Sequence, residues 1–356
     1  MTIVYILAAI LIFGVLIAVH EFGHFAAAKL CGVRVNEFSI GMGPLIWHKE
    51  TAETQYSLRL LPIGGFCAME GEDEDSSDQR SLGRQGFFKK LVIFAAGSFM
   101  NFLAGFLIIL AVYSGAAGFL IPAAAGVAPE FEQQNGQTIQ AGDIFYEING
   151  ERVYLYSDVS LLMGLHQGEP LDLVVLRDGE QVALDDVAWG TYTGTEGETY
   201  QGYGIYIAGN QIEEATPWTV LKTSWLNTID FVRIVRLSLQ MLVTGQAGMD
   251  DLSGPVGIVS TITQVGTTSE TIGAAVENIL YLGAMLAVNL AVMNLLPIPA
   301  LDGGKIFLLI IDEITMKLFR KKIPEKYETA VNTAGFVVLM GFMLLVTFND
   351  VFKLFG

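Results

Sequence analysis

The sequence predicts a membrane α-helical protein with four transmembrane helices, a β-hairpin region that dips into the membrane, and an inserted α+β domain outside the cytoplasm. Three observations favour this class. First, 52% of the 356 residues are hydrophobic and the mean hydropathy is +0.49, which is too apolar for an ordinary soluble protein. Second, several apolar stretches suit a hydrocarbon core of about 30 Å. Third, a polar and acidic segment separates the second of these stretches from the third.

The charge balance and the cysteines exclude some classes of function. A formal net charge of −17 argues against a nucleic-acid partner, since phosphates repel an acidic surface. The two cysteines, Cys31 and Cys67, lack the paired spacing of a metal-binding knuckle. Both fall in a segment expected on the cytoplasmic side, so we expect no structural disulfide.

The first predicted transmembrane helix covers Ile3 to Val19, an apolar run interrupted only by Tyr5 and Gly14. A cleaved signal peptide is the alternative interpretation of this segment. The run lacks a basic region before it, and ionisable residues follow it directly. Both features favour a helix that is retained in the membrane.

A potential metal-binding motif follows this run at once. His20, Glu21 and His24 form an H-E-x-x-H pattern, and on a helix this spacing places both imidazoles on one face. Two neutral histidines can fill two positions of a tetrahedral zinc site, while the glutamate handles the proton of a zinc-bound water. Ionisable side chains at this depth are costly unless they are paired or liganded. We therefore interpret the motif as functional rather than as a chance pattern.

The next segment, Val33 to Met69, predicts strands close to the membrane surface. Gln55 to Leu60 alternate between polar and apolar residues, and glycines and prolines interrupt the segment; this alternation is the period of a half-buried strand. We expect a membrane-dipping hairpin whose edge strand could pair with an unwound substrate. A plain interfacial loop is the alternative.

Polar residues from Pro122 to about Ala208 predict a separate domain. Ile148-Asn149-Gly150 ends a strand in a tight turn, and Asp178-Gly179 suits the turn of a hairpin. Together with Ala141-Gly142-Asp143, these features resemble a PDZ domain of the type associated with bacterial proteases. PDZ domains hold extended peptides by adding a strand to their sheet. A steric gate without a ligand is the alternative role.

The other apolar stretches complete the membrane part. Leu91 to Leu120 predicts the second transmembrane helix, in which Asn101 allows one interhelical hydrogen bond. Trp218 to Val243 is amphipathic and could lie on the outer surface or lean on the bundle. Ile279 to Leu296 and Ala334 to Phe348 predict the third and fourth transmembrane helices. The expected domains are an N-terminal membrane part (1–121, with the β region at 33–69), a PDZ-like domain (122–210) and a C-terminal membrane part (211–356).

Lysines and arginines set the expected orientation. They are frequent between the first and second helices and between the third and fourth, but rarer between the second and third. We therefore expect a multi-pass protein of a bacterial plasma membrane, with both termini and the PDZ-like domain outside the cytoplasm and the H-E-x-x-H motif toward the cytoplasmic half. The basic residues counted are Lys29, Arg34, Lys49, Arg59, Arg80, Arg84, Lys89, Lys90, Lys305, Lys317, Arg320, Lys321, Lys322 and Lys326.

Asp302 is the candidate for the third zinc ligand. A catalytic zinc site has three protein ligands and keeps its fourth position for water. Asp302 follows Pro297 and Pro299 and precedes Gly303 and Gly304, so an unwound segment can aim its carboxylate inward. The orientation places this segment on the side where His20 and His24 lie. A plain N-cap at the start of the next helix is the alternative role.

The combination of motifs resembles the site-2 protease family of intramembrane zinc metalloproteases. It consists of H-E-x-x-H at the end of the first helix, P-x-P-x-L-D-G-G at the end of the third, and a PDZ-like domain between the second and third. The match is to the bacterial branch with a single PDZ domain, the regulator of sigma factor protease type. The resemblance implies that His20, His24 and Asp302 bind Zn²⁺ and that Glu21 is the catalytic base.

The resemblance also implies how substrate is held and where it comes from. Asn289 and Asn294 are expected to hold the substrate backbone, and the hairpin around Gly64 and Gly65 to clamp it. The expected substrates are single-pass membrane proteins, such as anti-sigma factors or remnant signal peptides, already trimmed outside by an upstream site-1-type protease. The other partner is the lipid bilayer, and no nucleic acid is expected. The alternative function is a non-catalytic membrane protein that binds metal or recruits partners through the PDZ-like domain.

Overall fold

The protein is described by a computed structural model that covers residues 2–72, 76–194, 197–320 and 325–355. It divides into two compact units, of which one is Tyr113–Asp230 and the other is the remainder of the chain. Lys321 and Lys322, which were counted for the orientation, lie outside the described residues. The larger unit carries the H-E-x-x-H motif.

Four helices in the described part of the chain are long and apolar enough to cross a membrane, as the sequence predicts. They are α1 (Thr2–Cys31), α2 (Phe87–Tyr113), α7 (Ile272–Asn294) and Thr329–Lys353 within α9 (Glu325–Phe355). Their hydropathies of 2.9, 2.1, 1.6 and 2.0 are those of segments stabilised by lipid rather than by water. The protein is therefore a multi-pass membrane protein.

Two helix boundaries differ from the prediction for local reasons. The second helix ends at Tyr113 and not at Leu120, because Gly118–Leu120 forms strand β3, which pairs with β12 (Ile212–Glu214). The third begins earlier, at Ile272, because the Thr271 side chain caps it by accepting a hydrogen bond from the backbone N–H of Ala274 at 3.1 Å.

Three further long helices of the described chain lie between the second and fourth spans in the sequence. The amphipathic segment forms α5 (Pro217–Thr244), and α8 (Asp302–Phe319) follows the third span. An additional helix, α6 (Pro255–Thr268), begins with a proline at its first position, where a missing N–H is harmless. Helix α6 packs in one core with α1 and α7, to which Ala9, Leu16, Ile262, Ile279, Leu286 and Ala287 contribute buried side chains.

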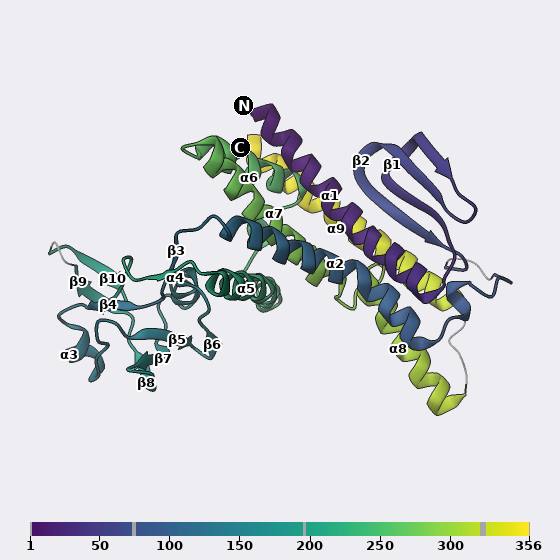
Figure 1. Ribbon diagram of the computed structural model, residues 1–356. Coiled ribbons are helices and arrows are strands. Elements are labelled where there is room, and N and C mark those ends of the chain that lie inside the picture. The colour runs from purple at the N-terminus through teal and green to yellow at the C-terminus, as the bar shows by residue number, and fades with distance from the viewer. Residues whose placement is uncertain (1, 73–75, 195–196, 321–324, 356) are drawn as a thin grey trace. The chain divides into compact units, whose positions relative to one another are not determined.

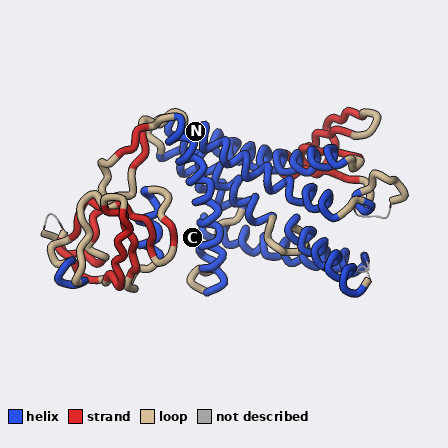
Figure 2. Tube along the Cα trace, turned by 60° about the horizontal axis from the view of Figure 1, so that its bottom comes forward, coloured by secondary structure: helices blue, strands red, loops and turns tan. Residues whose placement is uncertain are grey.

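The predicted hairpin is formed by two long antiparallel strands, β1 (Val35–Glu50) and β2 (Gln55–Met69). Figures 1 and 2 show it beside α1. The contact is close, since a Cβ at Gly14 of α1 would lie 2.6 Å from the carbonyl oxygen of Pro62. The pairing has register shifts, and Gly41, Gly43 and Gly64 at the irregularities adopt positive φ, which glycine does without strain.

Much of the surface of the β1–β2 hairpin is apolar. Many large apolar side chains of β1 and β2 are exposed, among them Ile40, Met42, Trp47, Leu60 and Leu61.

Asn101 is buried on α2, and its side-chain amide has no hydrogen-bond partner among the described residues. The predicted interhelical hydrogen bond of Asn101 is therefore wrong within the described part of the chain.

The smaller unit holds a four-stranded antiparallel sheet in the order β6-β5-β7-β8. Both predicted tight turns are present, with Asn149 and Gly150 and also Asp178 and Gly179 at positive φ, as primed two-residue turns require. The strands are β5 (Ile144–Ile148), β6 (Glu151–Arg152), β7 (Leu171–Arg177) and β8 (Glu180–Val187), and helix α4 spans Tyr156–Leu165.

The remaining elements of the smaller unit are short. Two-stranded pairs join β4 with β11 and β9 with β10, and Phe131, Phe145 and Tyr192 are among its largest fully buried side chains. These short elements are α3 (Phe131–Asn135), β4 (Ala124–Val127), β9 (Gly190–Thr193), β10 (Thr199–Gly202) and β11 (Ile205–Ile207). The larger unit also has two 3-10 turns, Leu82–Arg84 and Met249–Asp251.

Candidate active site

Helix α1 presents His20 and His24 on one face, as the spacing of the motif predicts. Their Nε2 atoms lie 3.2 Å apart, and the rings meet edge to face with centroids 4.8 Å apart. Both rings press against α2 at Gly97, where a Cβ would lie 2.4 Å from Nε2 of His24 and 2.7 Å from Cε1 of His20. Only a glycine leaves room for the two imidazoles at this helix crossing.

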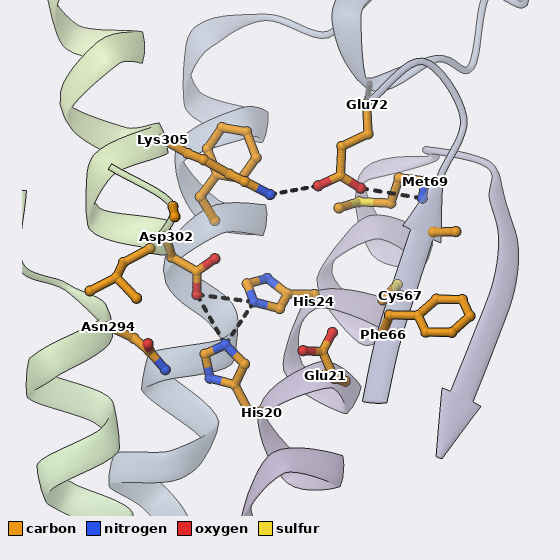
Figure 3. Close-up of a pocket in the computed structure, with 14 residues that line it drawn as sticks. His20, Glu21, His24, Phe66, Cys67, Met69, Glu72, Asn294, Asp302 and Lys305 are labelled. Atoms are coloured by element: carbon orange, nitrogen blue, oxygen red, sulfur yellow. Dashed lines mark hydrogen bonds and ion pairs between the residues drawn. The ribbon is translucent and has the colours of Figure 1, made fainter. Parts of the chain in front are cut away.

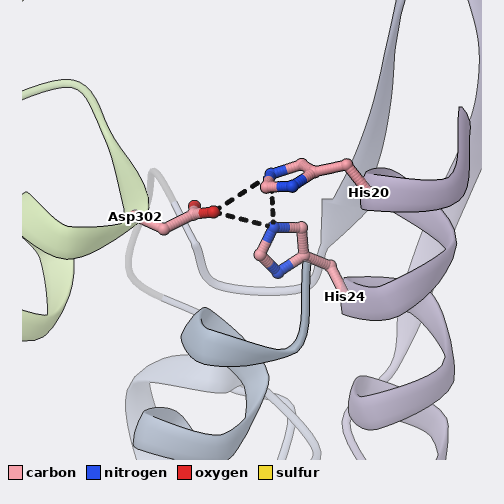
Figure 4. A group of neighbouring side chains, drawn as sticks. All are labelled: His20, His24 and Asp302. Carbon is pink, nitrogen blue, oxygen red and sulfur yellow. Dashed lines mark hydrogen bonds and ion pairs between the residues drawn. The ribbon is translucent and has the colours of Figure 1, made fainter. Parts of the chain in front are cut away.

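Asp302 completes a group of three side chains from opposite ends of the chain. Its Oδ2 atom lies 3.0 Å from Nε2 of His20 and 3.2 Å from Nε2 of His24 (Figure 4). Leu301 is the N-cap of α8 and Asp302 is the first helical residue, so the carboxylate points at the histidines instead of capping its own helix. The alternative N-cap role is therefore excluded.

Two glycines let the start of α8 fold tightly against the segment that follows α7. A Cβ at Gly303 would lie 2.2 Å from the carbonyl oxygen of Leu296, and one at Gly304 would lie 2.3 Å from that of Ile298. Ala300 precedes them at a φ of 75°, a conformation that non-glycine residues rarely adopt. This compact backbone is what turns Asp302 toward α1.

The donor set fits a zinc ion. Each of the three residues offers one ligand atom, and these atoms all lie within 4.8 Å of one another. Two ligands at about 2.0 Å from a tetrahedral ion lie about 3.3 Å apart, which is close to the spacing found here. His24 interacts through Nδ1 with the carbonyl oxygen of Ile93 at 2.8 Å, which fixes the ring and leaves Nε2 for a metal.

Glu21 lies next to this group but outside it. Its side chain faces β2, because a Cβ at Gly65 would lie 3.4 Å from Cγ of Glu21. A cavity of about 510 Å³ opens beside the motif and is lined by Glu21, the three potential ligands and the last residues of β2 (Figure 3). The carboxylate is thus free of the ligand set and available to a water or a substrate in the cavity.

The predicted substrate-binding residues are distributed unevenly around the cavity. Asn294, the last residue of α7, lines it, whereas Asn289 is not among the described residues that do. Gly64 and Gly65 directly precede the lining residue Phe66 in β2. The backbone of Gly65 runs close to β1, where a Cβ would lie 2.9 Å from the carbonyl oxygen of Ser39.

The cavity contains polar residues that sequence reasoning missed. Glu72 and Lys305 form an ion pair with 2.7 Å between Oε1 and Nζ, and Phe94 of α2 lies under the ammonium group. Lys305 follows Asp302 by three residues on a helix, and that spacing could have indicated it. Burial and the nearby Glu21 carboxylate raise the pKa of the Cys67 thiol, another residue of the cavity lining, to about 12.

Fold and site together define a multi-pass membrane zinc metalloprotease. The sequence matches the profile of peptidase family M50 over residues 8–342, and the chain belongs to this family. It is 37% identical over 348 residues to a Clostridium perfringens protein that bears the name of a zinc metalloprotease, covering 98% of both chains. It is 28% identical over 437 residues to the regulator of sigma-W protease RasP of Bacillus subtilis, covering 98% of this chain and 99% of the relative.

The family decides between the two predicted classes of function. A zinc metalloprotease named RasP from Geobacillus kaustophilus is 28% identical over 432 residues, covering 98% of each chain. The prediction of a zinc-dependent peptidase of the site-2 protease family is confirmed, and with it the prediction of Zn²⁺ as cofactor. The alternative of a non-catalytic metal-binding or adaptor protein is therefore wrong.

Proposed function

We propose that the protein is an intramembrane endopeptidase that cuts the transmembrane segment of single-pass membrane proteins. The observation that carries this proposal is that Asp302 of α8 meets His20 and His24, which lie on α1, a helix apolar enough to cross a membrane. A hydrolytic site within such a helix can reach peptide bonds that soluble proteases cannot. In this proposal the three residues are the zinc ligands.

Glu21 acts as general base and then as general acid. Zinc, when bound by the three ligands, supplies a Lewis acid that polarises a carbonyl group and lowers the pKa of a water. Glu21 takes a proton from the attacking water while the water oxygen bonds to the scissile carbonyl carbon. The same carboxyl group returns the proton to the departing amine as the C–N bond breaks. The products are a carboxylate and an amine.

The substrate must be extended at the bond that is cut, because a helical peptide bond is shielded and hydrogen-bonded internally. The end of β2 supports this step, since Phe66 to Ala68 pair with β1 on one side and have no second strand partner among the described residues. Phe66 to Met69 of β2 line the cavity. An unwound substrate could add a strand here, clamped at Gly64 and Gly65, while Asn294 and Asn289 hold its backbone amides.

The smaller unit serves as a PDZ-like domain outside the cytoplasm in this proposal. The lysine and arginine distribution supports this orientation, with the hairpin dipping into the membrane near the active site. Within the smaller unit, Tyr113–Asp230, the proposed PDZ-like domain has the bounds 122–210, and the proposed membrane parts are 1–121 and 211–356. The domain would admit substrates trimmed by an upstream site-1-type protease, such as anti-sigma factors or remnant signal peptides. The name of the Bacillus subtilis relative, a regulator of sigma-W protease, supports this substrate class.

The test replaces Glu21 by glutamine. Glu21→Gln keeps the shape of the side chain but removes its basicity, so cleavage of a trimmed single-pass substrate in detergent should fall about 10²- to 10⁴-fold. The zinc content should stay near one per chain, since Glu21 is no ligand. Glu277→Gln is the matched control, because Glu277 lies exposed on α7. Cleavage by Glu21→Gln at the wild-type rate would refute the proposed role.

A further inference from the structure

The ion pair between Glu72 and Lys305 joins the start of α8 to the segment after β2. The potential zinc ligands join α8 only to α1. Lys305 lies in the first turn of α8, and Glu72 follows the end of β2. Figure 3 shows the two side chains reaching toward each other across the cavity, on the side of Asp302 away from Asn294. At 2.7 Å between Nζ and Oε1, this is a charge-assisted hydrogen bond.

The Glu72 end of the pair has one further contact of its own. Its Oε2 atom accepts a hydrogen bond from the backbone N–H of Met69 at 3.4 Å. The backbone beside it is tied on both sides, because Glu70 donates its N–H to the carbonyl oxygen of Arg34 at 2.9 Å and accepts from the N–H of Leu82 at 2.8 Å. The chain that carries Glu72 is therefore anchored two residues before it, next to the cavity.

The end at Lys305 belongs to a turn that is weak on its own. Gly303 and Gly304 are required there by close backbone contacts, yet glycines lose the most conformational freedom when they enter a helix. They are also the buried residues of α8, so the rest of this helix contributes little packing that would hold its first turn. Asp302 lies in that same turn.

We propose that Glu72 and Lys305 are a positioning pair that holds the first turn of α8 in place and so keeps Asp302 over the two histidines. This inference rests on the proposed assignment of His20, His24 and Asp302 as zinc ligands. The apparent affinity for zinc scales with the fraction of molecules in which the turn is formed. The pair raises that fraction before the metal arrives.

The test measures the zinc dissociation constant of the full-length protein in detergent, by competition with a chromophoric chelator. Lys305→Met and Glu72→Gln should each raise this constant about tenfold, the lower end of what residues supporting metal ligands contribute. The double variant should be no worse than either single one. The exchanged pair Glu72→Lys/Lys305→Glu and the conservative Lys305→Arg should recover most of the affinity.

The signs of the two single effects separate positioning from simple electrostatics. If the charges acted on the zinc ion only through space, removing the Lys305 cation would tighten zinc binding and removing the Glu72 carboxylate would weaken it. A positioning pair requires that both substitutions weaken it. Lys317→Met is the matched control, because Lys317 pairs with Glu313 at 3.2 Å near the far end of the same helix, and it should leave zinc affinity unchanged.

A second measurement follows the turn itself without metal. Backbone amide hydrogen exchange at residues 302–305 of the zinc-free protein should be faster in Lys305→Met than in wild type and unchanged in Lys317→Met. Unchanged exchange, an unchanged zinc constant or tighter zinc binding in Lys305→Met would overturn the positioning role alone. A wild-type protein that binds no zinc, or binds it equally well after His20→Ala, would overturn the proposed ligand set as well.

Discussion

At the scale of single residues, the geometry of the active site depends on a glycine beside the two histidines. Gly97 has no side chain, and this allows α2 to lie directly against the imidazoles of His20 and His24. A hydrogen bond between His24 and the carbonyl oxygen of Ile93 then fixes one ring from the same helix. Helix α2 thus serves as the wall that sets the ring positions, although it provides no ligand itself.

Gly97→Ala should therefore impair zinc binding without touching a ligand. The added methyl group would lie 2.4 Å from Nε2 of His24, so the ring must turn away or the helices must separate. We expect at least about a tenfold loss of zinc affinity, measured by chelator competition. Gly341→Ala on α9 is the control, because a Cβ there meets nothing within 4 Å. An equal affinity in the two variants would contradict this account.

At the scale of elements, buried charge pairs fix where strands begin and end. Asp143 immediately precedes β5 and is 2% exposed, and Arg177 at the end of β7 donates to both of its carboxylate oxygens, with Nε and Oδ1 at 2.9 Å. Asp143 also accepts the backbone N–H of Gln140 at 2.8 Å. Burial alone would raise the pKa of Asp143, but these hydrogen bonds and the Arg177 charge lower it below its usual value.

The smaller unit should therefore lose stability in acid through Asp143. Because the folded pKa lies below the unfolded one of about 3.9, the contribution is complete above that value and disappears as the pH falls through the folded pKa. Asp143→Asn should lower the free energy of unfolding of the smaller unit by about 2 kcal/mol at pH 7. It should also weaken the fall of that free energy between neutral and acidic pH. Hydrogen exchange of β5 and β7 in the full chain, corrected for intrinsic pH dependence, measures both. A steeper fall toward acidic pH in Asp143→Asn would contradict the assignment.

At the scale of the whole molecule, the potential zinc ligands join the first helix to a segment near the other end of the chain. His20 and His24 belong to α1, and Asp302 opens α8. A metal that binds the folded state and not the unfolded one stabilises it by mass action. Zinc should accordingly stabilise the larger unit as well as serve catalysis.

Chelation should lower the thermal stability of the full-length protein in detergent. At a free zinc concentration about 100 times the dissociation constant, the stabilisation is about 2.7 kcal/mol, and a chelator should remove it. The measurement is the unfolding temperature with and without chelator, followed by backbone circular dichroism. His20→Ala should unfold at the same temperature in both conditions, and a persistent chelator effect in this variant would place the stabilising ion elsewhere.

The sequence by itself determined the features that depend on near neighbours along the chain. Hydropathy predicted four spanning helices, and the spacing of His20 and His24 predicted their common face, because both are properties of one helix. Asp302 was also predictable, since a proline- and glycine-rich segment follows the third span. Helix α6 was not, because its sequence is rich in threonine and lacks the long apolar run that identifies a span.

Only the tertiary structure decided which distant groups meet. Three contacts each join separate elements. Glu72 pairs with Lys305, the imidazoles of His20 and His24 pack against Gly97, and Phe66 to Met69 line the cavity. No local pattern encodes such contacts, because they depend on how helices and strands pack and on where their side chains point. The chain carries the chemical groups of a zinc peptidase in short motifs, and packing brings them within bonding distance.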